Sequence, residues 1–300
     1  MENDIFDKDL AHAIDDAINA FNKKVPQHEK RIYAEVIELL KALKTKNGRI
    51  LSTVENVRLI TKLKGKLLQV VNSREYRKDV DEFLKAYEEV AKLQDKYFAS
   101  FVTKYRPPAV LEILKQQSIE QTKGFLLQGG TTQEIIPEID KILRANITTG
   151  GTYAALTEQL RQVLTETDTP GAINKYMRQI TTDSINQYSA TYTAAISKAY
   201  GFEWFEYANT LIPTSRPFCI QCRKKRWIHQ SDIPTLLTGN IDGVKVPLNA
   251  KTDLPEGMID GTDQTNFIIY RGGYNCGHQL RPVPADIVPQ SAKNKVLNAN

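Results

Sequence analysis

Helical periodicity dominates the first two thirds of this 300-residue chain and ends at Gly201. Apolar residues recur three and four positions apart in segments that begin near residues 29, 54, 76, 110, 131, 152 and 171. This spacing places the apolar side chains on one face of each helix, and such faces are buried against other helices. The sequence therefore predicts a mainly α fold whose body is a helical bundle.

Glycine, proline and small polar residues mark the expected ends of these helices. Gly48 is expected to stop the first of them, and the seam from Tyr76 to Phe101 predicts one long helix that Gln94 interrupts. Further signals are a capping-box pattern at Thr131 with Glu134 and an N-cap with proline at Thr169-Pro170. Gly201 suits the C-terminal cap of the last long helix.

The pattern changes after Gly201, where Pro, Gly, Asn and Asp become frequent. Phe202–Tyr207 and Asn266–Tyr270 are expected to be strands, and the residues after about Pro284 to be an extended tail. We therefore expect four consecutive parts. They are an N-terminal helical docking region (1–105), a second helical part (106–200), a small irregular α+β module (201–283) and the tail (284–300).

The charge of the chain is uneven. The net charge is +5, and residues 211–300 carry 11 basic and 7 acidic side chains. All three cysteines, Cys219, Cys222 and Cys276, lie in this same last third. An odd and small number of cysteines does not suit a secreted disulfide scaffold.

The cysteines form the clearest chemical pattern. Cys219-Ile-Gln-Cys222 is a C-x-x-C pair expected in a tight turn, and Cys276-Gly-His278 is a second short-spaced pair. Brought together by the fold, they would complete a tetrahedral Cys₃His site, which suits structural zinc. The zinc would stabilise a module that has little core of its own. His229 is a rival to His278 as the fourth ligand.

Other interpretations of the cysteines stay open. They can be small buried side chains in a reduced compartment, a redox pair, or partners in a disulfide. A catalytic zinc would need water in one of the four ligand positions. The acidic residues of the module lie among Gly, Pro and Asn, and we interpret them as turn residues.

A basic cluster follows the first cysteine pair. From Arg216 to Gln230 there are five basic and no acidic residues, and they are Arg216, Arg223, Lys224, Lys225 and Arg226. These side chains can neutralise phosphates, and the adjacent Trp227 can stack on a base. The alternative is a solvated charged loop.

Several classes of protein are not expected. The P-loop, G-x-S-x-G and H-E-x-x-H motifs of common enzyme classes are absent. No stretch approaches 18 consecutive apolar residues, so neither a transmembrane helix nor a membrane partner is expected. The acidic first ten residues do not resemble a secretory signal.

The order of these features resembles the phage head-morphogenesis family, the Mu F-like minor head proteins. The resemblance covers about residues 130–283. It rests on a long helix with Met177–Asn186, the aromatic strand after Gly201, the segment Thr214–Cys219 and the turn Gly272–His278 with Arg281-Pro282. Many members end with a His-Pro-Asn-Cys-Arg-Cys turn, whereas this chain has Tyr-Asn-Cys-Gly-His.

The resemblance implies a minor capsid protein of the virion and not an enzyme, present in the host cytoplasm during assembly. Its partners would be the portal protein, the major capsid protein or both, and phage DNA during packaging or ejection. Two alternatives remain, a nucleic-acid-binding zinc module and a zinc-dependent hydrolase or toxin-like domain.

Overall fold

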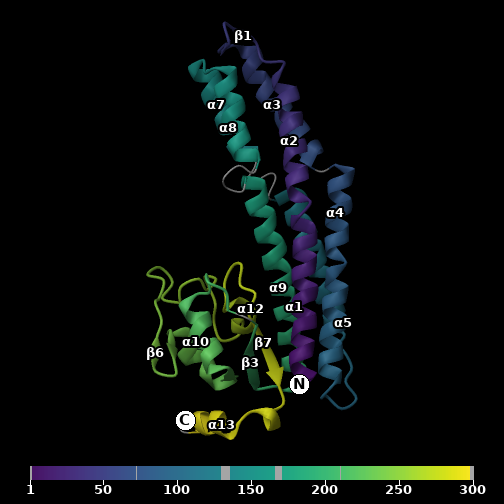
Figure 1. Ribbon diagram of the computed structural model, residues 1–300, viewed down its shortest axis with the longest axis vertical. Helices are drawn as coiled ribbons and strands as arrows, with labels where there is room; N and C mark the ends of the chain where they lie inside the picture. The colour runs from purple at the N-terminus through teal and green to yellow at the C-terminus, as the bar shows by residue number, and fades with distance from the viewer. Residues whose placement is uncertain (1, 72, 130–135, 166–170, 210, 298–300) are drawn as a thin grey trace. The chain divides into compact units, whose positions relative to one another are not determined.

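The computed structural model describes residues 2–71, 73–129, 136–165, 171–209 and 211–297, and it is mainly helical (Figure 1). The helices up to Tyr200 are α1 (Glu2–Asn22), α2 (Val25–Leu40), α3 (Val54–Val71), α4 (Arg74–Leu84), α5 (Ala86–Ala99), α6 (Val110–Gly124), α7 (Ile136–Thr149), α8 (Tyr153–Leu164) and α9 (Ala172–Tyr200). A two-stranded hairpin of β1 (Thr45–Lys46) and β2 (Arg49–Ile50) follows α2. The predicted helical body is therefore confirmed.

Shorter elements follow α9. They are β3 (Trp204–Ala208), α10 (Pro217–Lys225), β4 (Trp227–His229), α11 (Ile233–Leu237), β5 (Asn240–Ile241), β6 (Val244–Lys245), α12 (Phe267–Tyr270), β7 (Gln279–Val283) and α13 (Gln290–Leu297). The chain divides into two compact units. Unit 1 comprises residues 1–15, 86–118 and 182–300, and unit 2 comprises residues 16–85 and 119–181. Neither unit coincides with one of the four consecutive parts expected from the sequence.

Unit 2 is built around a bundle of α2, α3, α7 and α8, which pack pairwise. Each helix buries its apolar face, as Val36, Leu63, Leu143 and Leu160 illustrate with exposed fractions of 2% or less. Burying such side chains contributes about 1.5–3 kcal/mol each. The apolar residues at helical spacing in the sequence are thus the residues that form the core of this unit.

The β1–β2 hairpin is held firmly within unit 2. Asn47 and Gly48 have φ angles of 51° and 73°, which are typical of a two-residue hairpin turn. The buried Asn56 of α3 accepts from the backbone N–H of Lys44 at 2.8 Å and donates to the carbonyls of Lys44 and Leu51. Gly48 therefore belongs to a hairpin, and it lies several residues beyond the end of α2 at Leu40.

A buried carboxylate supports the start of α9 in unit 2. Glu29 of α2 is 1% exposed, and its Oε1 accepts from the backbone N–H of Asn174 at 3.1 Å. Negative charge beside a helix N-terminus is stabilising. Gly171 leaves room for this carboxylate, because a Cβ at that position would approach Oε1 to 2.8 Å.

In unit 1, α5 and the second half of α9 share buried polar contacts. Gln94 is 2% exposed and donates to the carbonyl and hydroxyl of Ser189, and Thr193 donates to Gln94 Oε1 at 3.1 Å. Gln279 of β7 also donates to Ser189 Oγ. The polar residue that interrupts the apolar seam therefore joins α5 to α9, and Ser189 joins α9 to the sheet.

A three-stranded antiparallel sheet, with β3 between β4 and β7, forms the centre of the C-terminal module. Phe205 and Tyr207 of β3 lie in a core with Phe218, Phe267 and Leu280. Trp204, on the other face, packs in a smaller cluster whose further members are Val283, Val288 and Val296. The alternation expected of a strand thus puts two separate cores on the two faces of β3.

Three local predictions are wrong. Asn266–Tyr270 is not a strand, because Asp263 Oδ1 accepts from the N–H groups of Thr265 and Asn266 and a helical turn, α12, follows. The tail is not extended, because α13 forms within it and Val296 is buried. The seam from Tyr76 to Phe101 is divided at Lys85 into α4 and α5.

Other predictions gave mixed outcomes. The strand expected at Phe202–Tyr207 is confirmed as β3, and Gly201 follows α9 with φ +67°. The signals at Thr131, Glu134 and Thr169-Pro170 lie outside the described residues.

Candidate metal centre

Three ligand side chains from two segments of unit 1 lie together. One atom each of Cys219, Cys276 and His278 lies within 4.8 Å of the other two. Cys219 belongs to α10, and Cys276 and His278 belong to the loop immediately before β7. The Sγ atoms of Cys219 and Cys276 are 3.9 Å apart, and Cys276 Sγ lies 3.6 Å from His278 Nδ1.

These distances fit a tetrahedral metal ion. With metal–sulfur distances near 2.3 Å and a metal–nitrogen distance near 2.05 Å, tetrahedral geometry separates two sulfurs by about 3.8 Å. It separates a sulfur and a nitrogen by about 3.6 Å. Both values match the separations in the structure. The three residues therefore lie close enough together to bind one metal ion.

Helix α10, and not a tight turn, carries the C-x-x-C pair. Pro217 occupies the first turn, where its missing N–H costs nothing, and the helix continues to Lys225. Cys222 follows Cys219 by about one turn and is fully buried in the module core. In the described part of the chain, the ligand group contains Cys219 and does not include Cys222.

His229 also lies outside the group. It belongs to β4, where its Nδ1 accepts from the backbone N–H of Ser231 at 3.2 Å and its ring packs against Trp204. Of the two histidines considered from the sequence, the structure places His278 beside the cysteines.

Arginine side chains hold the loop that carries Cys276 and His278. Arg216, the residue before α10, donates to the carbonyls of Gly272 and Tyr274. Arg271 donates to the carbonyl of His278 at 2.6 Å, and its guanidinium lies 5.6 Å from the centre of the Tyr207 ring. The positions of the ligands therefore depend on side chains outside the ligand set, as in many metal sites.

Glycines allow the loop to fold this tightly. A Cβ on Gly272 would overlap with Cys276 Sγ, and one on Gly257 would overlap with the Arg216 side chain. Gly273 has φ +69° and lies so close to the carbonyl of Gly257 that a Cβ there would overlap with it. The close backbone approach thus requires glycine at all three positions.

The two ligand cysteines differ in acidity. A hydrogen bond from Cys276 lowers the pKa of Cys219 to about 6. The same hydrogen bond, together with burial, raises the pKa of Cys276 to about 12. Burial also raises the pKa of Cys222. Cys219 is therefore the more acidic of these two thiols.

The basic cluster is engaged within the module. Besides Arg216, Arg223 donates to the carbonyl of Asn209, and Lys225, with a side chain only 9% exposed, pairs with Asp232 and Asp242. Arg226 pairs with Glu206 at 2.7 Å and lies over the ring of Trp227. Trp227 is half-buried against the Trp204 cluster. Lys224 is exposed.

Several residues of the site carried no recognisable signal in the sequence. Tyr207, whose ring stacks on His278, was recognised only as part of a strand, and Arg271 and Asp183 were not singled out. Asp183 of α9 accepts from the backbone N–H of Asn275. Gly272-Gly273, four and three residues before Cys276, is the one local signal that could have indicated a constrained loop.

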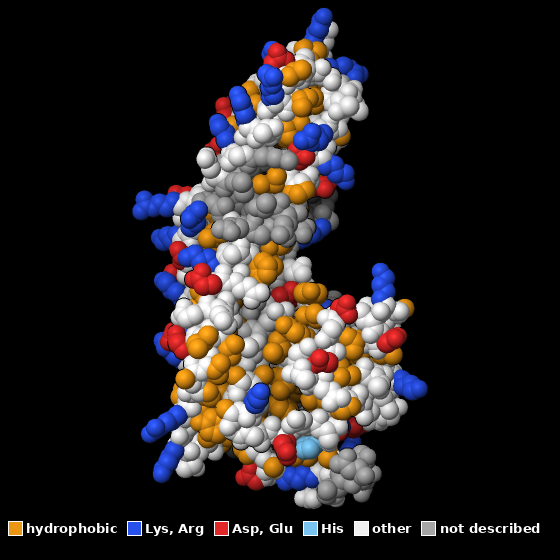
Figure 2. All heavy atoms as spheres, turned by 180° about the vertical axis from the view of Figure 1, so that it is seen from behind, with side chains coloured by type: hydrophobic (Ala, Val, Ile, Leu, Met, Phe, Trp, Pro, Cys, Tyr) orange, Lys and Arg blue, Asp and Glu red, His pale blue; other side chains and the backbone are white. Residues whose placement is uncertain are grey.

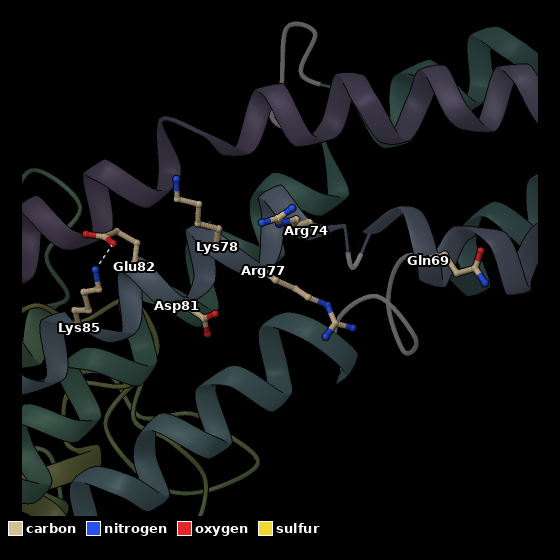
Figure 3. Close-up of a pocket in the computed structure, with 7 residues that line it drawn as sticks. All are labelled: Gln69, Arg74, Arg77, Lys78, Asp81, Glu82 and Lys85. Atoms are coloured by element: carbon tan, nitrogen blue, oxygen red, sulfur yellow. Dashed lines mark hydrogen bonds and ion pairs between the residues drawn. The ribbon is translucent and has the colours of Figure 1, made fainter.

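A separate groove of about 820 Å³ lies in unit 2 (Figure 3). The described residues that line it are Gln69 of α3 and Arg74, Arg77, Lys78, Asp81, Glu82 and Lys85 of α4 and its end. Lys85 pairs with Glu82 across this lining, and Asp81 pairs with Lys123. The groove is open and charged, and its lining holds none of the cysteine or histidine side chains of the metal centre.

Comparison of the chain with models of protein families, with curated proteins and with solved structures gives no match. Among the described helices, none combines the length and the apolar character that crossing a membrane requires.

Proposed function

We propose that this module is stapled by a structural zinc ion that Cys219, Cys276 and His278 bind. The observation that carries this proposal is the match between the ligand separations and the edges of a tetrahedron around zinc. A bound zinc ion would cross-link α10 to the loop before β7. Because only the folded module brings the ligands together, the free energy of zinc binding would stabilise the folded state. The chain's own residues supply the rest, because Arg216, Arg271 and Asp183 position the loop.

Cys222 is the proposed fourth ligand. It lies one helical turn from Cys219 on the same helix, and a change of its side-chain rotamer would direct the sulfur toward the other three. A site with four protein ligands is closed and structural, whereas a site with water in the fourth position is open to substrate. The identity of the fourth ligand thus separates a structural protein from a zinc-dependent hydrolase.

Elemental analysis of protein purified without chelators tests the zinc proposal. We expect about one zinc per chain in the wild type and well under one in Cys276→Ser. A wild-type protein that contains no zinc, and takes up none after refolding with zinc, would overturn the proposal.

Cobalt substitution tests the role of Cys222. We expect Cys222→Ser to weaken the thiolate-to-cobalt charge-transfer absorption while cobalt remains bound. An unchanged absorption, together with evidence for a bound water, would favour the hydrolase alternative and oppose a structural site.

We further propose that the chain acts as a phage minor head protein, a structural component that docks on portal or capsid. The order of the long helix, aromatic strand, cysteine segment and closing turn supports this proposal. Mass spectrometry of purified virions and of portal pull-downs tests it, and absence of the chain from both would contradict it. A nucleic-acid-binding zinc module remains the alternative, and there the bound duplex would contact the module itself.

A further inference from the structure

A larger excess of positive charge lies in unit 2, far in sequence from the basic cluster beside the cysteines. Residues 41–66 contain eight Lys and Arg residues and one acidic residue, Glu55. The resulting charge of +7 exceeds the +5 of the whole chain. Residues 136–165, which include the neighbouring helices α7 and α8, hold three basic and three acidic residues and so do not offset it.

Most of these cations are exposed. Lys46 and Arg49 of the β1–β2 hairpin and Arg58, Lys62 and Lys66 of α3 are exposed. In the described part of the chain, none of these five forms an ion pair, and Arg49 donates only to the carbonyl of Gly150. Lys41 and Lys44 are the paired members, with Glu38 and Glu55. On the face seen in Figure 2, blue side chains gather over this part of unit 2.

The five exposed cations lie on the β1–β2 hairpin and on α3, and together we call them the basic tip. Arg58, Lys62 and Lys66 are four residues apart, so they follow one side of α3 at intervals of about 6 Å. Asn56 joins the ends of the hairpin to α3, and the backbone N–H of Ile50 donates to the carbonyl of Gly151 at 2.9 Å. The hairpin and the helix are therefore held beside each other.

One feature of the hairpin points to an anionic ligand. Lys46 and Arg49 are directly opposite each other in the β1–β2 register. Like charges at opposed positions of an antiparallel pair destabilise it. A bound anion between them would turn this repulsion into two favourable contacts.

We propose that the basic tip binds the phosphate backbone of double-stranded DNA without sequence preference. A regular row of fixed cations suits a duplex, whose strands carry one charge per about 1.7 Å of axis. Residues 41–66 contain no Phe, Tyr or Trp. These residues therefore supply neither the stacking side chains that single-stranded nucleic acid uses nor the aromatic anchors typical of membrane surfaces. This proposal rests on unit 2 and is independent of the zinc proposal.

Fluorescence anisotropy with a labelled 30-base-pair duplex of mixed sequence tests the proposal on the full chain between 50 and 200 mM salt. The test variant combines Lys46→Gln, Arg49→Gln, Arg58→Gln and Lys62→Gln. We expect the affinity at 50 mM salt to fall at least tenfold, and the slope of log Kd against log salt to fall by about 3–4. The matched control combines Lys30→Gln, Lys96→Gln, Lys175→Gln and Lys198→Gln, which removes the same charge from exposed positions elsewhere.

Several results would overturn the proposal. One is a wild type that does not bind the duplex at 50 mM salt, and another is a matched control that loses as much duplex affinity as the test variant. A third is a wild type that binds a 30-nucleotide single strand more tightly than the duplex. The last is binding of phosphatidylserine vesicles that is tighter than binding of the duplex and depends on the basic tip. Lysine acetylation footprinting of the wild type provides a readout that needs no variant. The duplex should protect Lys46, Lys62 and Lys66 more than Lys30 and Lys224, and the reverse pattern would also contradict the proposal.

Discussion

The two basic regions of this chain differ in what surrounds their charges. Near the metal centre, Lys225 and Arg226 form ion pairs with carboxylates. Arg216 and Arg223 donate hydrogen bonds to backbone carbonyls. In the basic tip, five cations are exposed and form no ion pair with any residue that the structure describes. The comparison teaches that a basic run is open to an outside ligand only where the fold leaves its charges in solvent. Inside a small module, the same residue types serve as internal donors.

The first prediction concerns the ion pairs near the metal centre, where the largest effect on stability is expected. Glu206 lies between Arg226 and Arg281, and the Glu206 and Arg281 side chains are 10% and 6% exposed. We expect Glu206→Gln to lower the free energy of unfolding of unit 1 by about 3 kcal/mol, because Arg281 loses a buried partner.

Glu55 provides the control for Glu206. Its pair with Lys44 is exposed on both sides, so Glu55→Gln should change the free energy of unfolding by less than about 0.5 kcal/mol. Urea denaturation followed by circular dichroism measures both variants. Equal effects would show that the two regions do not differ in the way described.

The second prediction concerns the loop that Arg216 holds. In Gly272→Ala, the new Cβ would displace the Cys276 sulfur, so we expect lost zinc and a free energy of unfolding lower by about 1–3 kcal/mol. Gly277 is the matched control, because it adjoins Cys276 and a Cβ there would meet nothing within 4 Å. Competition with a chromophoric chelator measures zinc retention, and a Gly277→Ala protein as defective as Gly272→Ala would contradict the packing argument.

The third prediction separates the two roles of arginine. Removing the donors of Arg216 by Arg216→Gln should weaken zinc binding by about 10–100-fold, as expected for a residue that orients metal ligands. Its affinity for duplex DNA should change less than twofold. Lys224→Gln should alter neither quantity by more than twofold. If Arg216→Gln lowers DNA affinity as strongly as the basic-tip variant, the division between the regions fails.

The smallest expected effect is on the stability of unit 2 at acidic pH. His28 of α2 is buried beside Asp79 of α4, with His28 Nε2 2.8 Å from Asp79 Oδ2, and burial lowers the pKa of His28. The unfolded chain therefore binds the proton more readily, so stability contributed by neutral His28 is full above about pH 6.5 and declines as the pH falls toward its folded pKa.

His28→Gln should consequently flatten the dependence of unit 2 stability on pH between 7 and 5. Denaturation in a Cys219→Ser background removes the separate contribution of zinc release. A wild-type protein whose stability does not decline over this range would refute the role of His28.

Prediction from the sequence succeeded where one local pattern determines the secondary structure and the buried face. Periodicity in residues such as Ile32, Val36 and Leu160 predicted buried helix faces, and all three are buried. It failed at Asn266–Tyr270, because a short apolar run does not distinguish a strand from a helical turn. The side chain of Asp263, three residues earlier, favours the turn.

The metal centre shows the same limit. Spacing predicted Cys219, Cys276 and His278, and the structure brings these three together. Spacing could not show that Cys222 lies on a helix within the core, nor that Arg216 reaches Gly272 and Tyr274, because such contacts arise from tertiary packing. The cation-rich hairpin does not stand out in a count of charges over residues 1–105, because basic and acidic residues nearly balance over that long segment.

The discontinuous make-up of the two units has a consequence for synthesis on the ribosome. Unit 1 contains residues 1–15 but also residues 182–300, so its first segment must wait for the last third of the chain. In unit 2, Glu29 meets its partner 145 positions later. Contacts this distant in sequence close slowly. A nascent chain therefore contains all of unit 2 only once residue 181 has been made, and the first segment of unit 1 gains its remaining partners only after that.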